Sequence, residues 1–265
     1  MQPQAAKKAI RVVRRLFQLF FLGGALFLAA KLLLGVPTRT VEYYCPMGGI
    51  VSFYGLFKKQ QFICALGEMN LSLALALLAT VLITKRSFCS WVCPLGTIFE
   101  GLSALRRRII PESHLRLSDR TDAVLCNLKY IVLAAILILT YRAGELVFRG
   151  YDPFYVLFTG GKGHDLIPIV SLAVLGAILV ASFLFEFAWC RYLCPLAAVM
   201  NTLSRLGLLK VRRDRTGCDA CGACDTVCPQ RIRVSEAHKI TSVDCTNCFE
   251  CLTHCPRPRV LEVSV

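Results

Sequence analysis

The segment FCSWVCPLGTIFEGLSALRR, residues 88–107, returns in altered form as WCRYLCPLAAVMNTLSRLGL at residues 189–208. Each copy carries two cysteines four positions apart, with proline directly after the second, in the pattern C-x-x-x-C-P. Each copy also follows a long apolar run. An internal repeat of this kind indicates that one structural unit, an apolar hairpin ending in a cysteine motif, occurs twice in the chain.

Four apolar runs approach the roughly 20 residues that a helix needs to cross a bilayer. They cover residues 16–34, 62–83, 123–141 and 166–188. Hydrophobic residues make up 55% of the 265 residues, which is high for a soluble domain. We therefore expect a mainly α membrane protein, with four transmembrane helices arranged as two repeated hairpins over residues 1–210.

Lysine and arginine concentrate in alternate segments between these runs. They are frequent before the first run, between the second and third, and after the fourth, and they are sparse in the other two connections. Because such residues stay on the cytoplasmic side, we expect a multi-pass protein of the inner (cytoplasmic) membrane with both termini in the cytoplasm. The formal net charge of +14 then follows from topology and requires no nucleic-acid partner.

The C-terminal segment, residues 211–265, holds two dense cysteine runs, CDACGACDTVCP at 218–229 and CTNCFECLTHCP at 245–256. This spacing is typical of bacterial ferredoxins with two [4Fe–4S] clusters, in which the fourth cysteine of each run binds the other cluster. We therefore predict a ferredoxin-like α+β domain with two clusters. Zinc sites use four ligands rather than two interlocked runs, and disulfides are rare in the cytoplasm.

The crossover of the fourth cysteine assigns the eight thiols to two sets. The first cluster is predicted to bind Cys218, Cys221, Cys224 and Cys255. The second cluster is predicted to bind Cys228, Cys245, Cys248 and Cys251. Two redox centres held so close together are suited to carrying electrons rather than to binding a substrate at an open iron.

The C-x-x-x-C-P copies supply four more thiols: Cys89, Cys93, Cys190 and Cys194. Cysteines four positions apart lie on the same face of a helix, and the repeat symmetry would bring the two pairs together. Four converging thiolates can hold a third cluster or a single metal ion. Two alternatives stay open, namely small buried core residues and a redox-active disulfide.

With both C-x-x-x-C-P copies and the paired ferredoxin runs, the chain resembles the NapH-type membrane ferredoxins, which serve as quinol dehydrogenase membrane subunits. The resemblance extends over nearly the whole length. It implies electron exchange between the quinone pool and a partner oxidoreductase subunit, either an iron–sulfur protein or a catalytic one. The surrounding lipid bilayer would supply the quinone or quinol.

Quinol oxidation also needs groups that accept protons at the edge of the membrane. The candidates for this quinone site, in the outer turns and the starts of the spans, are Glu42, Tyr44, Glu68, Asp152 and His164. Each of these residue types is also common as an interfacial anchor.

Two other functions fit parts of the sequence. The membrane-edge thiols would suit a metal-handling or assembly factor for a redox enzyme, and the clusters would suit a membrane anchor that only relays electrons. The paired ferredoxin runs favour the electron-transfer subunit of an oxidoreductase complex.

Overall fold

The computed structural model describes residues 4–35, 67–110, 118–143, 151–159, 168–257 and 259–264. The chain divides into two compact units. The first unit joins Met1–Phe21, Leu78–Thr97 and Val199–Val265, and the second joins Leu22–Leu77 and Ile98–Ala198. The first unit therefore combines the C-terminal cysteine runs with the segment that carries the first C-x-x-x-C-P copy.

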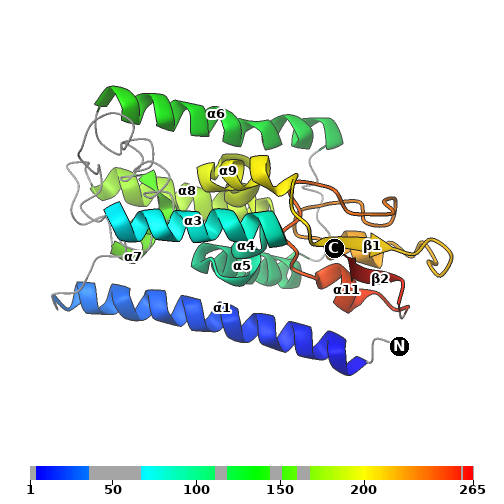
Figure 1. The fold of residues 1–265 in the computed structure, drawn as a ribbon. Coiled ribbons are helices and arrows are strands. Elements are labelled where there is room, and N and C mark those ends of the chain that lie inside the picture. The colour runs from blue at the N-terminus through cyan, green and yellow to red at the C-terminus, as the bar shows by residue number, and fades with distance from the viewer. Residues whose placement is uncertain are drawn as a thin grey trace. The chain divides into compact units, whose positions relative to one another are not determined.

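Long helices occupy the predicted apolar runs (Figure 1). They are α1 (Gln4–Leu33), α3 (Gly67–Thr84), α6 (Asp119–Ala143) and α8 (Pro168–Leu184). Within the described residues, Ala6–Leu33 and Arg120–Arg142 are long and apolar enough to cross a membrane, whereas Ser72–Thr84 and Ile169–Leu184 are shorter apolar helices. The mainly helical fold is thus confirmed, and the four-span arrangement stays a prediction.

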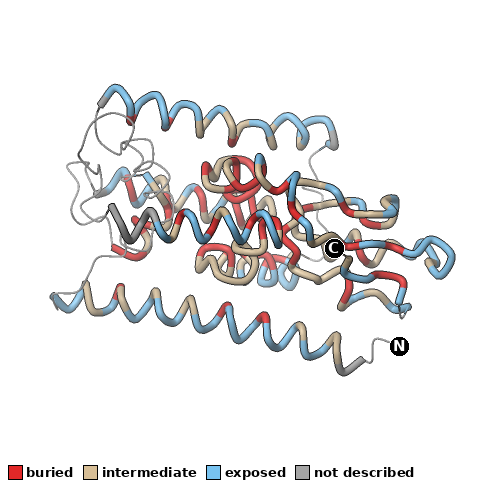
Figure 2. Tube along the Cα trace, in the orientation of Figure 1, coloured by how far each residue is buried: buried red, intermediate tan, exposed pale blue. Residues whose placement is uncertain are grey.

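Helices α1 and α6 expose much of their apolar surface (Figure 2). Phe20 of α1 is 75% exposed and Phe27 is 60% exposed. On α6, Val124 and Ile131 are 71% and 65% exposed. Large exposed apolar surfaces are rare on soluble monomers, so these two helices have the surface expected of lipid-facing segments.

Shorter helices surround the two C-x-x-x-C-P copies. The first copy forms α4 (Ser87–Trp91) and leads into α5 (Pro94–Ile109), and the second forms η3 (Trp189–Leu193) and leads into α9 (Pro195–Ser204). Each motif proline is the first residue of its following helix, where its missing N–H leaves no hydrogen bond unmade. Between α6 and α8 lies a short helix, α7 (Pro153–Thr159).

The C-terminal domain is a small α+β unit. Strand β1 (Lys210–Arg213) pairs antiparallel with β2 (Leu261–Ser264), with Val211 opposite Val263. Two short helices, α10 (Ala223–Thr226) and α11 (Glu250–His254), follow the starts of the two cysteine runs. The apolar core between them is made by Val211, Cys224, Val234, Ile240, Leu252, Val260 and Leu261. The strands thereby hold the two ends of the domain together around its cysteines.

Candidate iron–sulfur sites

Four cysteines line one pocket in the C-terminal domain: Cys218, Cys221, Cys224 and Cys255. Three of them come from the first run, and Cys255 follows α11 in the second run. This is the ligand set that the crossover pattern assigns to the first cluster. A pocket with four convergent sulfur donors fits the donor chemistry of a [4Fe–4S] cube.

The first pocket is accessible to solvent and surrounded by charges of both signs. Cys221 is exposed. The backbone N–H of Ala220 and the nearby Arg213 lower the pKa of Cys218. Burial and the neighbouring Asp225 carboxylate raise the pKa of Cys224 to about 11. The pocket lining includes Arg213, Asp219 and Arg257, and Arg257 pairs with Asp219 at 2.5 Å.

The second run gathers around Cys228, which belongs to the first run in sequence. Burial raises the pKa of Cys251 well above its usual value, and the charges of Cys248, Cys245 and Cys228 raise it further. Burial likewise raises the pKa of Cys248 to about 12, with Cys228 and Cys245 among the contributing charges. The four thiols therefore lie close enough to destabilise one another's negative charge. The positive irons of a bound cluster would neutralise that charge.

Tight turns carry the cysteines of both runs. Ala220, Asn247 and Phe249 all adopt the left-handed backbone region, with φ of 52°, 43° and 58°. Gly222 has φ of 69° directly before α10. Alternation between right- and left-handed residues turns successive N–H groups to one side, and such concavities bind anions and iron–sulfur clusters.

The second run is bound to the segment 84–91, here called the docking segment. Ser90 Oγ donates a hydrogen bond to the carbonyl oxygen of Thr246 at 2.7 Å, and Trp91 Nε1 donates to that of Asn247 at 3.1 Å. In return, Asn247 Nδ2 donates to the Thr84 carbonyl oxygen at 2.9 Å. The Trp91 ring also meets the Phe249 ring edge-on, with centroids 6.2 Å apart.

Helix α1 supports the same segment from its N-terminal half. Arg14 Nε and Gln18 Nε2 donate to the Ser90 carbonyl oxygen at 3.2 and 3.0 Å. Arg14 also pairs with Glu250 at the start of α11, and Lys7 Nζ donates to the Cys255 carbonyl oxygen at 2.7 Å. The basic residues that predict a cytoplasmic N-terminus thus also bind the cysteine-rich domain.

Two buried cations lie at the start of the docking segment. Lys85 Nζ donates to the carbonyl oxygens of Ile240 and Ser242 at 2.9 and 3.3 Å. Arg86 Nη1 pairs with Asp244 Oδ1 at 3.0 Å. Lys85 is 1% exposed and Arg86 is not exposed at all, so both charges lie inside the protein beside the second run.

The first C-x-x-x-C-P copy has a locally widened turn. The N–H of Cys93 donates to the carbonyl oxygen of Phe88 at 2.9 Å, five residues back. The following helix then passes close to the first cysteine, since a Cβ on Gly96 would lie 2.1 Å from the Cys89 carbonyl oxygen. Only glycine allows this approach.

The second copy has the same widened turn. The N–H of Cys194 donates to the Trp189 carbonyl oxygen at 2.8 Å, and η3 is a π-helix. The two residues after its first cysteine, Arg191 and Tyr192, both donate to the carboxylate of Asp122 on α6. Cys126, one turn along α6, is a neighbour of the Arg191 guanidinium.

No group of three or more His, Cys, Asp or Glu side chains is placed to hold a single metal ion in the part of the chain that the structure describes. A four-iron cube spaces its cysteine ligands further apart than a single ion does, so the pocket of the first cysteine set is a different kind of site. Convergence of Cys89, Cys93, Cys190 and Cys194 on one centre stays a prediction.

The quinone candidates are only partly described. Glu42, Tyr44 and His164 lie outside the described residues, as does the side chain of Glu68. Asp152 precedes α7, and its Oδ1 accepts a hydrogen bond from the Phe154 N–H at 3.1 Å. Burial raises the pKa of Asp152 to about 6. This carboxylate therefore has a structural role as a helix cap, and its pKa also lies close to neutrality.

The docking residues were not identified from the sequence. Lys85 and Arg86 belong to the basic segment between the second and third apolar runs, and no sequence pattern distinguishes Ser90, Trp91 or Asn247. The available signal was their position inside or beside a cysteine motif, where a side chain that is not a ligand can still fix the ligand's surroundings.

Two family models match the chain, and both describe iron–sulfur binding. A model described as a 4Fe-4S binding domain matches residues 66–111 and again residues 167–214. A model described as a 4Fe-4S dicluster domain matches residues 210–256. The double match confirms the internal repeat. The cysteines within the two repeated matches are those of the C-x-x-x-C-P motifs.

Several curated proteins are similar over most of the chain. The Escherichia coli protein YccM, named provisionally as an electron transport protein, is 30% identical over 85% of this chain, which spans 64% of that protein. An uncharacterized protein of Methanocaldococcus jannaschii is 31% identical over 77% of this chain and 83% of its own length.

The ferredoxin-type protein NapH of Escherichia coli is 29% identical over 72% of this chain and 69% of its own length. No solved structure matches the chain. The repeated motif, the paired cysteine runs and these similarities over most of its length together show that the chain belongs to the family of NapH-type ferredoxin proteins with 4Fe–4S binding domains.

Proposed function

We propose that this protein is a membrane electron-transfer subunit that passes electrons between the quinone pool and a partner oxidoreductase. The observation that carries the proposal is the sorting of the eight tail cysteines. Cys255 lines the pocket of the first run, and Cys228 lies among the thiols of the second. Two [4Fe–4S] cubes bound at these places would take up and release single electrons.

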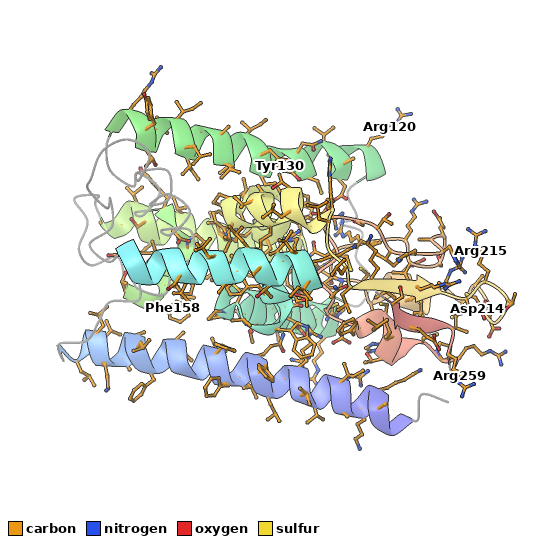
Figure 3. All side chains as sticks on the ribbon, viewed as in Figure 1. Arg120, Tyr130, Phe158, Asp214, Arg215 and Arg259 are labelled. Carbon is orange, nitrogen blue, oxygen red and sulfur yellow. The ribbon has the colours of Figure 1, made fainter. Side chains whose placement is uncertain are left out.

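The two sites differ in access, which suggests different exchange partners. The first pocket opens to solvent at Cys221. Arg215 and Arg259 project near Asp214 at the end of the same domain (Figure 3), and the Asp214 N–H bonds the Val260 carbonyl oxygen at 2.8 Å. This face is therefore open to a partner subunit. The second site is bound to the docking segment and lies beside the first C-x-x-x-C-P motif.

We further propose that Cys89, Cys93, Cys190 and Cys194 hold a third iron–sulfur centre. Both motifs have the same five-residue hydrogen bond to the second cysteine, so each presents its pair with similar local geometry. The repeated match to a 4Fe-4S binding domain also supports the assignment, because these are the cysteines it contains. Such a centre would shorten the gap between a quinone and the tail.

The membrane arrangement is part of the same proposal. Four spans with both termini in the cytoplasm of an inner-membrane protein agree with the distribution of lysine and arginine. A reporter fused after Val265 should then report cytoplasm, and one placed near Lys162 should report the opposite side. Reversed reporter activity would reject this topology. Quinone would react near the outer turns, where Asp152 and the other candidate proton acceptors lie in the sequence.

The proposal is tested by iron analysis and redox-titrated electron paramagnetic resonance (EPR) of the purified full-length protein. Two distinct [4Fe–4S] signals are expected, and a quinone analogue should shift the signal of the centre nearest its site. Cys228→Ser should damage the second cube and leave the first, because Cys228 lies among the second run's thiols. Loss of the first cube instead would contradict the ligand sets.

The third centre has its own test on the full-length chain. Wild-type protein should contain iron in excess of two cubes, and the double variant Cys93→Ser/Cys194→Ser should lose that excess alone. Cys126→Ser serves as the matched control, since this cysteine lies outside both motifs. Wild-type protein with iron for two cubes only would leave the motif cysteines as packing residues or a redox pair.

A further inference from the structure

Lys85 combines two costly features. Its backbone is left-handed, with φ of 57°, and its side chain is 1% exposed. Lysine is rarely buried so completely without a charged partner, and residues with a Cβ rarely adopt this backbone region. A position that retains both features is held there by its surroundings, and such strain often marks a functional site.

The contacts of Lys85 hold it in the loop that leads into the second cysteine run. Its Nζ donates to the carbonyl oxygens of Ile240 and Ser242 at 2.9 and 3.3 Å. Among the described residues no carboxylate pairs with it, whereas Arg86 pairs with Asp244 and Arg14 pairs with Glu250. Lys85 therefore places a buried positive charge beside the second site, with Lys210 and Lys239 as further cations nearby.

A glycine makes room for the lysine stem. A Cβ on Gly207 would lie 2.5 Å from Lys85 Cγ and 3.1 Å from the Ser204 carbonyl oxygen. The segment after α9 also binds the end of α3, since the Leu208 and Leu209 N–H groups donate to the Leu82 and Ile83 carbonyl oxygens at 3.2 and 2.9 Å. The path of the lysine side chain is thus fixed from both sides.

The second site otherwise disfavours negative charge. Thr246 and Asn247, which lie between Cys245 and Cys248, are 4% and 2% exposed, and the charges of Lys85 and Arg86 act on Cys245 from close by. Reduction of a bound cube adds one more negative charge to the same place. Burial therefore opposes reduction, and a nearby fixed cation favours it, since net charge and solvent exposure set cluster potentials.

The first site also has a buried cation, since Arg213 lines its pocket and is 8% exposed, but this site is open to solvent. Its pocket has an exposed cysteine, Cys221. Arg213 Nε donates to the Ala237 carbonyl oxygen at 3.0 Å, and Arg257 pairs with Asp219. Water itself can stabilise the extra charge of a reduced cube there. The extra negative charge of a reduced cube would therefore be stabilised mainly by solvent at the first site and by buried cations at the second.

The internal repeat points to the same residue. Lys85 lies four residues before Cys89, the first motif cysteine. Glu186 lies four residues before Cys190 and so occupies the corresponding place in the second copy. Glu186 accepts contacts from Arg106 and Arg107 at 3.5 and 3.1 Å. Lys85 therefore has an acidic counterpart in the second copy, although that copy also contacts the cysteine-rich domain through Asn201 and Ser204.

We propose that Lys85 tunes the reduction potential of the second cube, and that its buried charge offsets the burial of that site so that the cube accepts an electron. The inference rests on the proposed function only in requiring that both cubes are present. Its effect is specific to one of two centres in the same domain, so the first cube serves as an internal reference.

The test is redox-titrated EPR of the full-length protein, with the two signals assigned by Cys228→Ser and Cys255→Ser. Lys85→Met should lower the reduction potential of the second cube relative to that of the first. The expected shift is about tenfold in the equilibrium constant for reduction, which is about 59 mV for a one-electron couple. The first cube should titrate as in wild type. Lys85→Arg should restore the wild-type difference, and Arg257→Met is the control on the exposed first site.

Lys85→Gln keeps a hydrogen-bond donor but removes the charge, so it should shift the potential of the second cube as Lys85→Met does. It serves as the second neutral variant if Lys85→Met binds little iron. An unchanged potential of the second cube in an iron-loaded neutral variant would overturn the proposal, as would an equal shift of both cubes. Absence of two cubes from wild-type protein is a different result, because it would overturn the proposed function itself.

Discussion

The two C-x-x-x-C-P copies share their local geometry and differ in what they bind. In both, the second cysteine donates a hydrogen bond to a carbonyl oxygen five residues back, at 2.9 Å in the first copy and 2.8 Å in the second. In the first copy, Ser90 and Trp91 bind the second cysteine run. In the second copy, Arg191 and Tyr192 bind Asp122 of α6. The cysteines and the proline thus determine the shape of the turn, while the residues between the cysteines determine which segment the turn binds.

The chemistry of the two attachments differs as well. Ser90 and Trp91 donate neutral hydrogen bonds to backbone carbonyl oxygens, each worth about 1 kcal/mol net. Arg191 and Asp122 form a largely buried ion pair, with side chains 7% and 18% exposed. A buried pair is expensive to break because one charge is left without a partner. The cysteine motif of the second copy is therefore held to α6 by a buried ion pair, whereas the cysteine motif of the first copy is held to the second cysteine run by several weaker bonds.

The largest effect is expected where the second copy is braced. Arg191→Met should destabilise the protein by about 3–5 kcal/mol, because it leaves the Asp122 carboxylate partly buried without its cation. Thermal unfolding in detergent measures the loss. The double variant Arg191→Met/Asp122→Leu should recover much of it, since no charge is then left alone. Equal stability of Arg191→Met and wild type would remove the distinction between the copies.

Glycine at the start of α5 should give the next largest effect. Gly96→Ala places a Cβ 2.1 Å from the Cys89 carbonyl oxygen, a backbone atom that cannot move alone. A loss of about 1–3 kcal/mol is expected from overpacking, with displacement of Cys89. The second copy has Ala197 at this place, fully buried, and Ala197→Gly should cost only about 1 kcal/mol. The reverse order of the two losses would mean that the first copy can relax around a side chain.

Much of this comparison could be predicted from the sequence, and part of it could not. The repeat was evident because identical cysteine and proline spacing recurs, and the prolines begin α5 and α9 as their fixed φ favours. Ferredoxin spacing also predicts the crossover of Cys228 and Cys255, and Cys255 does line the pocket of the first run. These features depend on neighbours within a few residues or on a pattern with one known geometry.

The docking contacts depend instead on which distant segments meet. Trp91 and Asn247 are far apart in sequence, and nothing local to either indicates the other. Lys85 follows an apolar run, where lysine usually reaches toward water. Its burial results from the loop at 240–242 and from Gly207, so only the folded unit identifies it. The widened turns differ in this respect, because Cys194 directly before Pro195 is extended, with ψ of 116°, as proline favours for the residue before it.

A smaller effect is expected at Trp91. Trp91→Phe removes the N–H that donates to the Asn247 carbonyl oxygen and reduces the contact with Phe249. We expect a loss of about 1–2 kcal/mol in the attachment of the second run. Hydrogen–deuterium exchange should become faster in residues 245–251. Tyr192→Phe, at the matching place of the second copy, should leave that exchange unchanged, and a similar increase in both variants would indicate a general loss of stability.

The smallest effect, about 1 kcal/mol, is expected for Ser90→Ala. Ser90 Oγ donates to the Thr246 carbonyl oxygen at 2.7 Å, and Thr246 is 4% exposed, so the variant leaves a buried acceptor without this donor. The Ser90 carbonyl oxygen still accepts from Arg14 and Gln18, which keeps the docking segment attached to α1. Ser87→Ala is the matched control, because Ser87 Oγ donates to the local Thr84 carbonyl oxygen at 2.6 Å. Faster exchange around Thr246 in Ser90→Ala but not in Ser87→Ala would locate the effect in the link between motif and domain. Identical exchange in both would mean that Trp91 and Lys85 carry the attachment without help from the serine, and the first copy would then depend on fewer bonds than its contacts suggest.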